Sequence, residues 1–443
     1  MSSLSNRLER GRWYSWFFWA TASSFFLYEF FVRVMPSVIL TDLSKQLNAT
    51  PIELSSALAF YLWIYAPMQL IVGGLFDRFG TKFLLIGAAL IVAAGSFIFA
   101  DAHGLAAVGL SRGLAGFGSA FAFIGAIYVA TVWFSPSRLA LIAGMTTAVG
   151  MLGEVIGQTP MSAAVAAFGW REVVHMAGWC GVVIAVVILV VVPPRPKWFH
   201  DRFTEEDEVD FGIIHGIRMV LSRWQLWVIG LICAILYLPL SVVAAMWGNT
   251  FMETTGSFTS DQASFATVML AVGWLVGCPL TGVISDRIGS RRIPLLAGSI
   301  GGGIAMTLLL WPNMFGYWGL LSIMLVGGIM TSTQAICFAV AMELSPKALR
   351  GTAAACTNFI CMLVAAGIQI MIGWVLTSTV LAPNGHRTAG HTIETANMLQ
   401  NATPEQFRWA MAIVPALFVV SIVLCLILPE TAPPRKASST ATP

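Results

Sequence analysis

The sequence predicts an all-α polytopic membrane protein made of two similar halves, and three observations predict this. Hydrophobic residues form 57% of the 443-residue chain and charged residues only 10%, against roughly 25% charged residues in ordinary soluble domains. Apolar runs of about 20 residues, long enough to cross a hydrocarbon core of roughly 30 Å, recur from end to end. Finally, one short polar motif occurs twice, in corresponding places of the two halves.

The repeated motif is GGLFDRFGTK at Gly73–Lys82, and its second copy is GVISDRIGSRR at Gly282–Arg292. In each copy an apolar run ends in a small-residue turn, which is followed by an Asp-Arg pair, a Gly and one or two cations. The two Asp residues are 209 positions apart, and two Ser-Pro turns further along, at Pro136 and Pro346, are 210 apart. Two unrelated landmarks that share one offset indicate a duplicated half of about 200 residues.

The motif resembles the signature loop of the major facilitator superfamily, G-x-x-x-D-R-x-G-x-[RK], which lies between helices two and three and recurs between helices eight and nine. The resemblance covers about residues 13–430. It implies twelve transmembrane helices in two six-helix bundles, related by pseudo-two-fold symmetry, around a central cavity that opens to each side in turn. It therefore implies a secondary transporter whose substrate is a small molecule. Such a transporter spans the lipid bilayer, works as a monomer and needs no cofactor.

The apolar runs set the expected boundaries of these elements. In the first half the expected spans are 13–36, 53–74, 82–100, 104–133, 139–167 and 170–192. In the second half they are 224–250, 261–284, 292–312, 316–342, 351–380 and 406–428. We therefore expect a six-helix bundle over residues 1–192, a polar linker over 193–223, a second bundle over 224–428 and a tail over 429–443.

Lysine and arginine predict the orientation of the chain in the membrane. With the amino terminus in the cytoplasm, 18 of the 24 Lys and Arg residues fall on the cytoplasmic side, as the positive-inside rule requires. Both termini and the linker are then cytoplasmic, in what we expect to be a bacterial inner membrane. The net charge of +3 reflects this topology and does not indicate nucleic-acid binding.

The acid in each motif copy is not needed to set orientation, so it indicates a gate. In the family that the motif resembles, this loop latches the outward-open state. We expect Asp77 near the amino-terminal end of the following helix, where negative charge is favoured; the alternative is plain anchoring by positive charge. The predicted gating residues are Gly73, Asp77, Arg78, Gly80 and Lys82 in the first copy, and Gly282, Asp286, Arg287, Gly289, Arg291 and Arg292 in the second.

Ionisable side chains inside the spans are few, and each needs a partner or a task because burying it in hydrocarbon is costly. Helix one reads FFLYEFFVRVMPSV, which places Glu29 and Arg33 four apart on one helical face. Helix four carries Arg112 and helix five carries Glu154. A rise of about 1.5 Å per residue puts the two acids and Arg112 in one band beyond the midplane. The RGLAGFG sequence around Arg112 also resembles the family's helix-four Arg motif, which is tied to proton coupling.

Two interpretations of these charges remain open. In the first they are structural ion pairs, Glu29 with Arg33 and Glu154 with Arg112, unless Arg33 extends along its helix to the membrane surface. In the second, one carboxylate carries a proton and one Arg holds a substrate anion. Arrival of the anion would then withdraw the cation from the carboxylate and favour its protonation, which is a physical route to symport.

The second half carries hydrogen-bonding and aromatic side chains in place of charges, so we expect it to set shape and selectivity. Packing between helices is the alternative role for each of them. The predicted substrate and proton site comprises Glu29, Arg33, Arg112, Glu154, Tyr28, Tyr237, Trp247, Trp274, Gln334 and Asn358. No metal site is predicted.

An enzyme is not expected, because the sequence shows no Ser-His-Asp set, phosphate loop, metal-ligand cluster or paired-carboxylate site. We expect proton-coupled uptake of a small anionic or zwitterionic solute by alternating access, and helix one resembles bacterial nutrient and siderophore carriers. Export of a metabolite, drug or siderophore by proton antiport is the alternative, although helix five lacks the G-P-x-x-G-G pattern of drug antiporters. A membrane sensor that uses the same fold without transport is a third class, and neither the linker nor the tail offers it a signalling domain.

Overall fold

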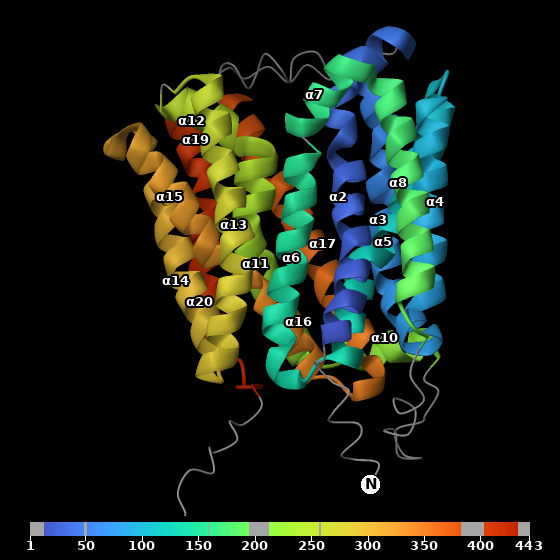
Figure 1. Ribbon diagram of the computed structural model, residues 1–443. Coiled ribbons are helices and arrows are strands. Elements are labelled where there is room, and N and C mark those ends of the chain that lie inside the picture. Colours follow the sequence, from blue (N-terminus) through green and yellow to red (C-terminus); the bar gives the residue numbers. More distant parts are fainter. Residues whose placement is uncertain are drawn as a thin grey trace, which may run out of the picture.

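The computed structural model describes residues 13–47, 51–157, 159–194, 212–256, 258–381 and 403–432, and these are almost entirely helical. Eleven stretches of the described residues are long and apolar enough to cross a membrane. A twelfth helix, α2 (Trp13–Leu47), runs alongside them (Figure 1), although its many Trp, Tyr and Ser residues and its Glu and Arg lower its hydropathy. The expected all-α, twelve-helix membrane protein is thus confirmed.

The first six spans form one bundle. They are α2, α3 (Pro51–Phe79), α4 (Lys82–Ala100), α5 (Leu105–Trp133), α6 with α7 (Leu139–Ile156 and Thr159–Phe168) and α8 (Trp170–Val191). A short 3-10 turn, Pro136–Arg138, connects α5 to α6. Of the expected linker, the structure describes the short helix α10 (Ile213–Leu221), whereas residues 195–211 lie outside the described part.

The last six spans form the second bundle. They are α11 (Trp224–Leu238) continued by a π-helical segment (Pro239–Trp247) and α12 (Gly248–Gly256), α13 (Ser260–Ile288), α14 (Arg292–Leu309), α15 with α16 (Gly316–Thr331 and Gln334–Glu343), α17 (Arg350–Leu381), and α19 with α20 (Pro404–Met411 and Ile413–Ile427). Short 3-10 turns, Pro312–Phe315 and Lys347–Leu349, precede α15 and α17. Residues 433–443 of the expected tail lie outside the described part.

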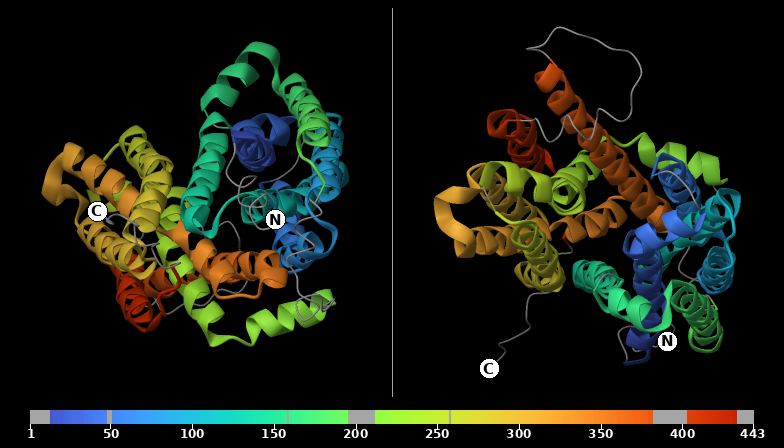
Figure 2. Two further views of the ribbon diagram at one scale, coloured as in Figure 1. Left: turned by 60° about the horizontal axis from the view of Figure 1, so that its bottom comes forward. Right: turned by 90° about the horizontal axis from the view of Figure 1, so that it is seen from above.

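The two bundles stand side by side and touch along two seams, where α3 packs on α17 and α13 packs on α6 (Figures 1 and 2). In the duplicated chain α13 is the counterpart of α3, and α17 is the counterpart of α6. The seams are therefore equivalent under the pseudo-two-fold axis. Residues that belong to one seam can be compared directly with residues of the other.

Several helices are longer than the sequence indicates. The first expected span stops at Pro36, but α2 continues through this proline to Leu47. Proline removes one backbone hydrogen bond, and in a packed membrane bundle neighbouring groups can satisfy the freed carbonyl. Proline is therefore a poor end signal in this chain, and Pro67 and Pro279 also lie inside helices.

The first motif copy binds one bundle to the other. Asp77, near the end of α3, accepts hydrogen bonds from the backbone N–H groups of Gly351 at 3.0 Å and Thr352 at 2.8 Å, and from the Thr352 hydroxyl at 2.7 Å. These N–H groups belong to the first turn of α17, where they have no partner within their own helix. The negative charge is thus placed at a helix amino terminus, as expected, but the helix is α17 of the other bundle and not the one that follows Asp77. Asp77 caps α17 because the end of α3 meets α17 at the seam.

The second copy repeats this arrangement across the other seam. Asp286, near the end of α13, accepts a hydrogen bond from the backbone N–H of Leu141 in the first turn of α6, at 3.1 Å. It also pairs with Arg291, whose guanidinium donates to Glu343 as well, at 2.9 Å. Each motif Asp therefore caps a helix of the opposite bundle, and in the second copy an arginine network holds the Asp in place.

Steric constraints explain why glycine occupies four positions of the two motif copies. A Cβ at Gly73 would lie 2.5 Å from the carbonyl oxygen of Gly351, and one at Gly282 would lie 2.6 Å from that of Ala140, so the backbones of both seams touch. Gly80 and Gly289 have φ of +76° and +70°, a conformation that costs other residues energy. We call the end of the molecule that carries both copies the motif face and the other end the opposite face; the bundles are closed on each other at the motif face.

The remaining motif cations lie around these contacts. The Arg78 guanidinium lies over the ring of Phe79, and Lys82 begins α4. Arg287 is exposed at the end of α13, and Arg292 donates to the carbonyl of Leu426. The gating role of the motif residues stays a prediction, for which the two Asp caps supply a testable geometry.

We expect Asp77→Ala to open the motif face. The change removes three hydrogen bonds to a charged acceptor, each worth about 1.5–3 kcal/mol, and about 1.4 kcal/mol already shifts an equilibrium tenfold. Spin labels at the exposed positions Phe79 and Lys347 should therefore show a longer-distance population in electron double resonance. Asp101→Ala removes an acid from the opposite face and should leave the distances unchanged. Identical distributions in Asp77→Ala and the unsubstituted protein would contradict the latch.

Candidate functional site

A small cavity of about 50 Å³ lies between the bundles. Its walls are Phe26, Phe30, Arg33, Tyr65, Phe123, Thr147 and Met151 from the first half, and Tyr237, Trp274, Gln334, Phe338, Asn358 and Met362 from the second. Of these described lining residues, Arg33 is the one that carries a charge. No group of three or more His, Cys, Asp or Glu side chains is placed to hold a metal ion among the residues that the structure describes.

Arg33 is held in the cavity wall by aromatic rings. Its guanidinium carbon lies 5.0 Å from the ring centre of Tyr65, 5.3 Å from that of Phe30 and 5.6 Å from that of Tyr61. The faces of aromatic rings attract cations electrostatically. The side chain is 19% exposed and does not extend to the membrane surface, so that alternative is excluded.

Glu29 lies one helical turn before Arg33 and is fully buried. Its Oε1 is 4.0 Å from the Arg33 guanidinium and accepts a hydrogen bond from the Tyr61 hydroxyl. Its Oε2 has no hydrogen-bond partner among the described residues. A carboxylate in hydrocarbon is costly unless it is paired, and here a single hydroxyl and the more distant cations of Arg33 and Arg112 compensate the charge.

Arg112, on α5, is bound to the backbone of α2. Its guanidinium donates to the carbonyl oxygens of Val32 at 3.0 Å and Arg33 at 3.4 Å, and it lies 4.5 Å from the ring centre of Tyr61. Within the described residues it forms no ion pair with Glu154. The second structural pair is therefore wrong: Arg112 fixes helix one against helix four, and Glu154 lies elsewhere on α6.

Tyr61 joins these charges into one cluster, and sequence reasoning missed it. Its hydroxyl donates to Glu29, Arg112 contacts its ring, and the ring of Tyr65 stacks on it at 5.6 Å with an interplanar angle of 14°. Tyr61, Tyr65 and Gln69 are spaced four apart in the apolar run of α3. Such spacing puts all three on one helical face, so a polar stripe on helix two was the signal available in the sequence.

The second half completes the cavity wall with amide and indole groups. The Asn358 amide donates to the Gln69 side-chain oxygen at 2.9 Å, which links the bundles beside the cavity. The Gln334 amide donates to the sulfur of Cys233 at 3.0 Å, and the Trp274 indole donates to Thr331 at 2.9 Å. The ring of Tyr237 meets that of Trp274 edge to face at 6.1 Å.

Five residues of the predicted set do not line the cavity. Glu29 and Arg112 belong to the cluster around Arg33 described above, and the other three are Tyr28, Trp247 and Glu154. Tyr28 contacts the Ser96 hydroxyl on α4 at 3.3 Å, because its side chain points about 100° around the helix from that of Glu29. Trp247 packs on Phe407 of α19, near the opposite face. Glu154 is half-buried on α6 and is not among the lining residues.

Two six-helix bundles, related by a pseudo-two-fold axis and enclosing a cavity between them, define a secondary-transporter fold. A sequence model of the Major Facilitator Superfamily matches residues 17–370. The chain belongs to this superfamily, as the paired motif indicates.

The chain is similar to transporters whose names specify organic anions. It is 25% identical over 268 residues to the probable sulfoacetate transporter SauU of Cupriavidus necator, a match that covers 58% of this chain and 62% of that protein. It is 22% identical over 384 residues to the probable galactarate/D-glucarate transporter GudP of Escherichia coli, with 78% and 84% covered. Among solved structures, the proton:xylose symporter XylE superimposes with a TM-score of 0.66 at 17% identity, over 94% of this chain and 96% of that one.

We expect Tyr61→Phe to destabilise the protein measurably. The change leaves both carboxylate oxygens of Glu29 without a hydrogen-bond donor, and an unsatisfied buried group costs about 1–3 kcal/mol, more when it is charged. Tyr28→Phe is the matched control, because it removes a hydroxyl that contacts only a neutral Ser96. The unfolding temperature in detergent micelles should fall clearly further for Tyr61→Phe. Equal values for the two variants would show that the hydrogen bond to Glu29 contributes nothing special.

Proposed function

We propose that the protein imports a small organic anion together with protons by alternating access, with Arg33 binding the anion and Glu29 carrying the proton. The observation that carries this proposal is the position of Arg33, the one charged side chain among the described residues of the cavity wall. The acid nearest to it, Glu29, is buried behind it and reaches it only at 4.0 Å.

The environment of Arg33 suits an anion. Aromatic faces and a carboxylate 4.0 Å away hold the guanidinium in the cavity wall. The planar fork of an Arg guanidinium matches the geometry of carboxylate oxygens. Across the cavity, Trp274, Gln334 and Asn358 add polar groups on a largely aromatic wall. The names of two of the relatives agree with this chemistry, since sulfoacetate, galactarate and D-glucarate are organic anions.

Proton coupling follows from competition for Arg33. While the cavity is empty, Arg33 and the Tyr61 hydroxyl stabilise an ionised Glu29, and Arg112 adds to this from farther away. An anion that binds Arg33 draws the cation away and adds a second negative charge nearby, so Glu29 is stabilised by taking up a proton. Anion and proton then enter together, and both leave when the cavity opens to the other side.

We further propose that the motif face is cytoplasmic, because the Lys and Arg residues gather there. The conformation described, closed at the motif face, then belongs to the outward-facing half of the cycle. Inward opening must separate the backbones at Gly73 and Gly282 and release the caps formed by Asp77 and Asp286. The motif acids thus set the stability of one state relative to the other.

The test is solute-driven proton movement in de-energised cells that produce the protein. Addition of sulfoacetate or D-glucarate, the two anions named for the relatives, should alkalinise the medium, and Glu29→Gln should abolish this signal together with concentrative uptake. Counterflow should survive in Glu29→Gln, because exchange of anion for anion requires no net proton transfer. Glu172→Gln, which removes an exposed carboxylate in the first turn of α8, is the control and should retain all three activities.

Each other outcome contradicts a part of the proposal. Acidification on solute addition would assign the protein to proton antiport and export. Binding without counterflow in proteoliposomes would assign it to the sensor class. Full concentrative uptake by Glu29→Gln would show that Glu29 does not carry the proton.

A further inference from the structure

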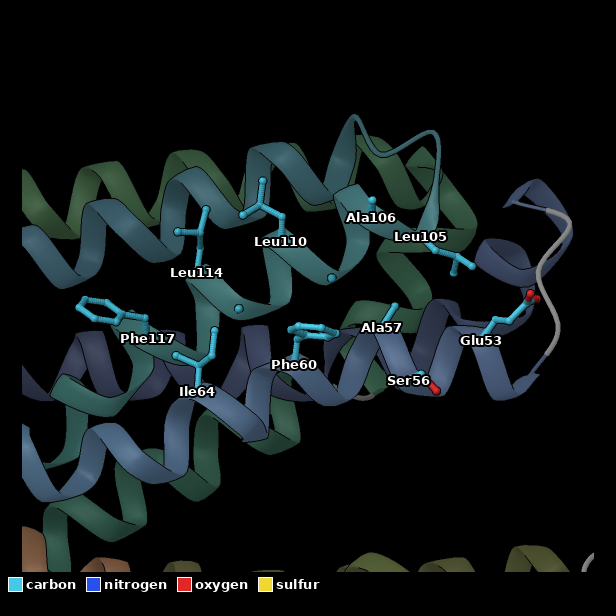
Figure 3. A pocket seen from close by; sticks show the side chains of 12 residues that line it. Glu53, Ser56, Ala57, Phe60, Ile64, Leu105, Ala106, Leu110, Leu114 and Phe117 are labelled. Atoms are coloured by element: carbon cyan, nitrogen blue, oxygen red, sulfur yellow. The ribbon is translucent and has the colours of Figure 1, made fainter. Parts of the chain in front are cut away.

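An apolar groove of about 750 Å³ lies on the outer surface of the first bundle, between α3 and α5 (Figure 3). It is separate from the central cavity. Its walls are Glu53, Ser56, Ala57, Phe60 and Ile64 of α3, and Leu105, Ala106, Gly109, Leu110, Gly113, Leu114 and Phe117 of α5. Figure 3 shows Phe60 and Ile64 facing Leu110 and Leu114 across the groove, with Glu53 at one end.

Glycines on α5 create this groove. At Gly116 a Cβ would overlap the backbone of Tyr61, so α3 and α5 touch there. One turn nearer the opposite face, a Cβ at Gly113 would meet only the tip of Ile64 at 2.9 Å, and at Gly109 the nearest atom is 3.7 Å away on Phe60. The two helices therefore diverge toward the opposite face, and the missing side chains leave the space between them open.

The position of the groove matches one leaflet of a bilayer. Both helices are membrane spans, and Phe60 and Leu110 are 52% and 58% exposed, so the groove opens sideways toward lipid. From Glu53 to Ile64 it extends eleven residues, or about 17 Å at the helical rise. Half of a hydrocarbon core of roughly 30 Å is about 15 Å. A single acyl chain of the leaflet at the opposite face would run the whole length of the groove.

The chemistry at the mouth of the groove selects a headgroup. Glu53 and Ser56 are exposed and are the polar residues among the groove walls that the structure describes, and both lie at the end where a headgroup would sit. A carboxylate attracts the ammonium of an amine-bearing zwitterionic lipid and repels a lipid with net negative charge. We propose that the groove is a binding site for a phospholipid with an ethanolamine head, whose acyl chain fills the space between α3 and α5.

Such a lipid would lie directly behind the charged cluster. Phe60 and Gly113, in the groove, are the chain neighbours of Tyr61 and Arg112, which face the interior. An acyl chain in the groove excludes water from the back of this cluster and restricts the separation of α3 and α5. The bound lipid therefore stabilises the arrangement that holds Glu29, without contact with the substrate.

The test uses purified protein in detergent with added dioleoyl phosphatidylethanolamine or dioleoyl phosphatidylglycerol. The unsubstituted protein should retain the ethanolamine lipid in native mass spectrometry in preference to the glycerol lipid, and its unfolding temperature should rise more with the former. Gly109→Leu places a side chain in the groove, and both effects should be lost. Gly87→Leu is the matched control, because a Cβ at this glycine of α4 has no atom within 4 Å and lies outside the groove.

Two further variants separate the parts of the proposal. Ala106→Leu fills the mouth of the groove from an exposed position, so it tests occupancy even if Gly109→Leu fails to fold. Glu53→Gln should keep a bound lipid and lose the preference for the ethanolamine head. Equal retention of lipid by the unsubstituted protein and by both groove-filling variants would overturn the site, and an unchanged preference in Glu53→Gln would overturn the assigned headgroup.

Discussion

Burying ionised groups in a low-dielectric interior is expensive, and the first bundle is organised around three of them. Glu29, Arg33 and Arg112 lie where water is scarce, so each must be stabilised by protein groups. Arg112 is stabilised by carbonyl groups of α2, Arg33 by aromatic faces, and Glu29 by one hydroxyl and by the more distant cations of Arg33 and Arg112. Of the three charges, that of Glu29 is the least compensated, which makes it the natural place for a proton to bind and leave.

The same need to pair buried polar groups determines the contacts at the motif face. Helix amino termini at the seams would expose unsatisfied N–H groups, and Asp77 and Asp286 satisfy them from the opposite bundle. A few directional bonds at each seam can be broken and remade without disturbing either bundle's core. In the second copy Asp286 also pairs with Arg291, which pairs in turn with Glu343, so the two seams are related by symmetry but differ in their side-chain contacts.

The sequence was sufficient to predict the features that come from the internal repeat or from amino-acid composition. The duplication, the twelve helices, the paired motif and the charges of helices one and four could all be read from spacing and hydropathy. The contacts between the bundles could not be predicted, because they depend on how the two halves pack together. Examples are the helix that Asp77 caps and the hydrogen bond from Asn358 to Gln69. The role of Tyr61 was not predicted, because a tyrosine is not distinctive in a span rich in aromatic residues. Its spacing from Tyr65 and Gln69 was the informative signal. Glu154 and Tyr28 do not line the cavity, and the sequence did not indicate this because it does not say which way each side chain of a helix faces.

The central claim is that anion binding at Arg33 and protonation of Glu29 are one linked event. The most direct measurement is proton uptake by the purified protein when sulfoacetate or D-glucarate is added in weakly buffered detergent solution with a pH indicator. The account predicts that protons are taken up in proportion to the anion bound, and that Arg33→Gln removes binding and uptake together. Saturable binding of the anion with no change in pH would contradict it.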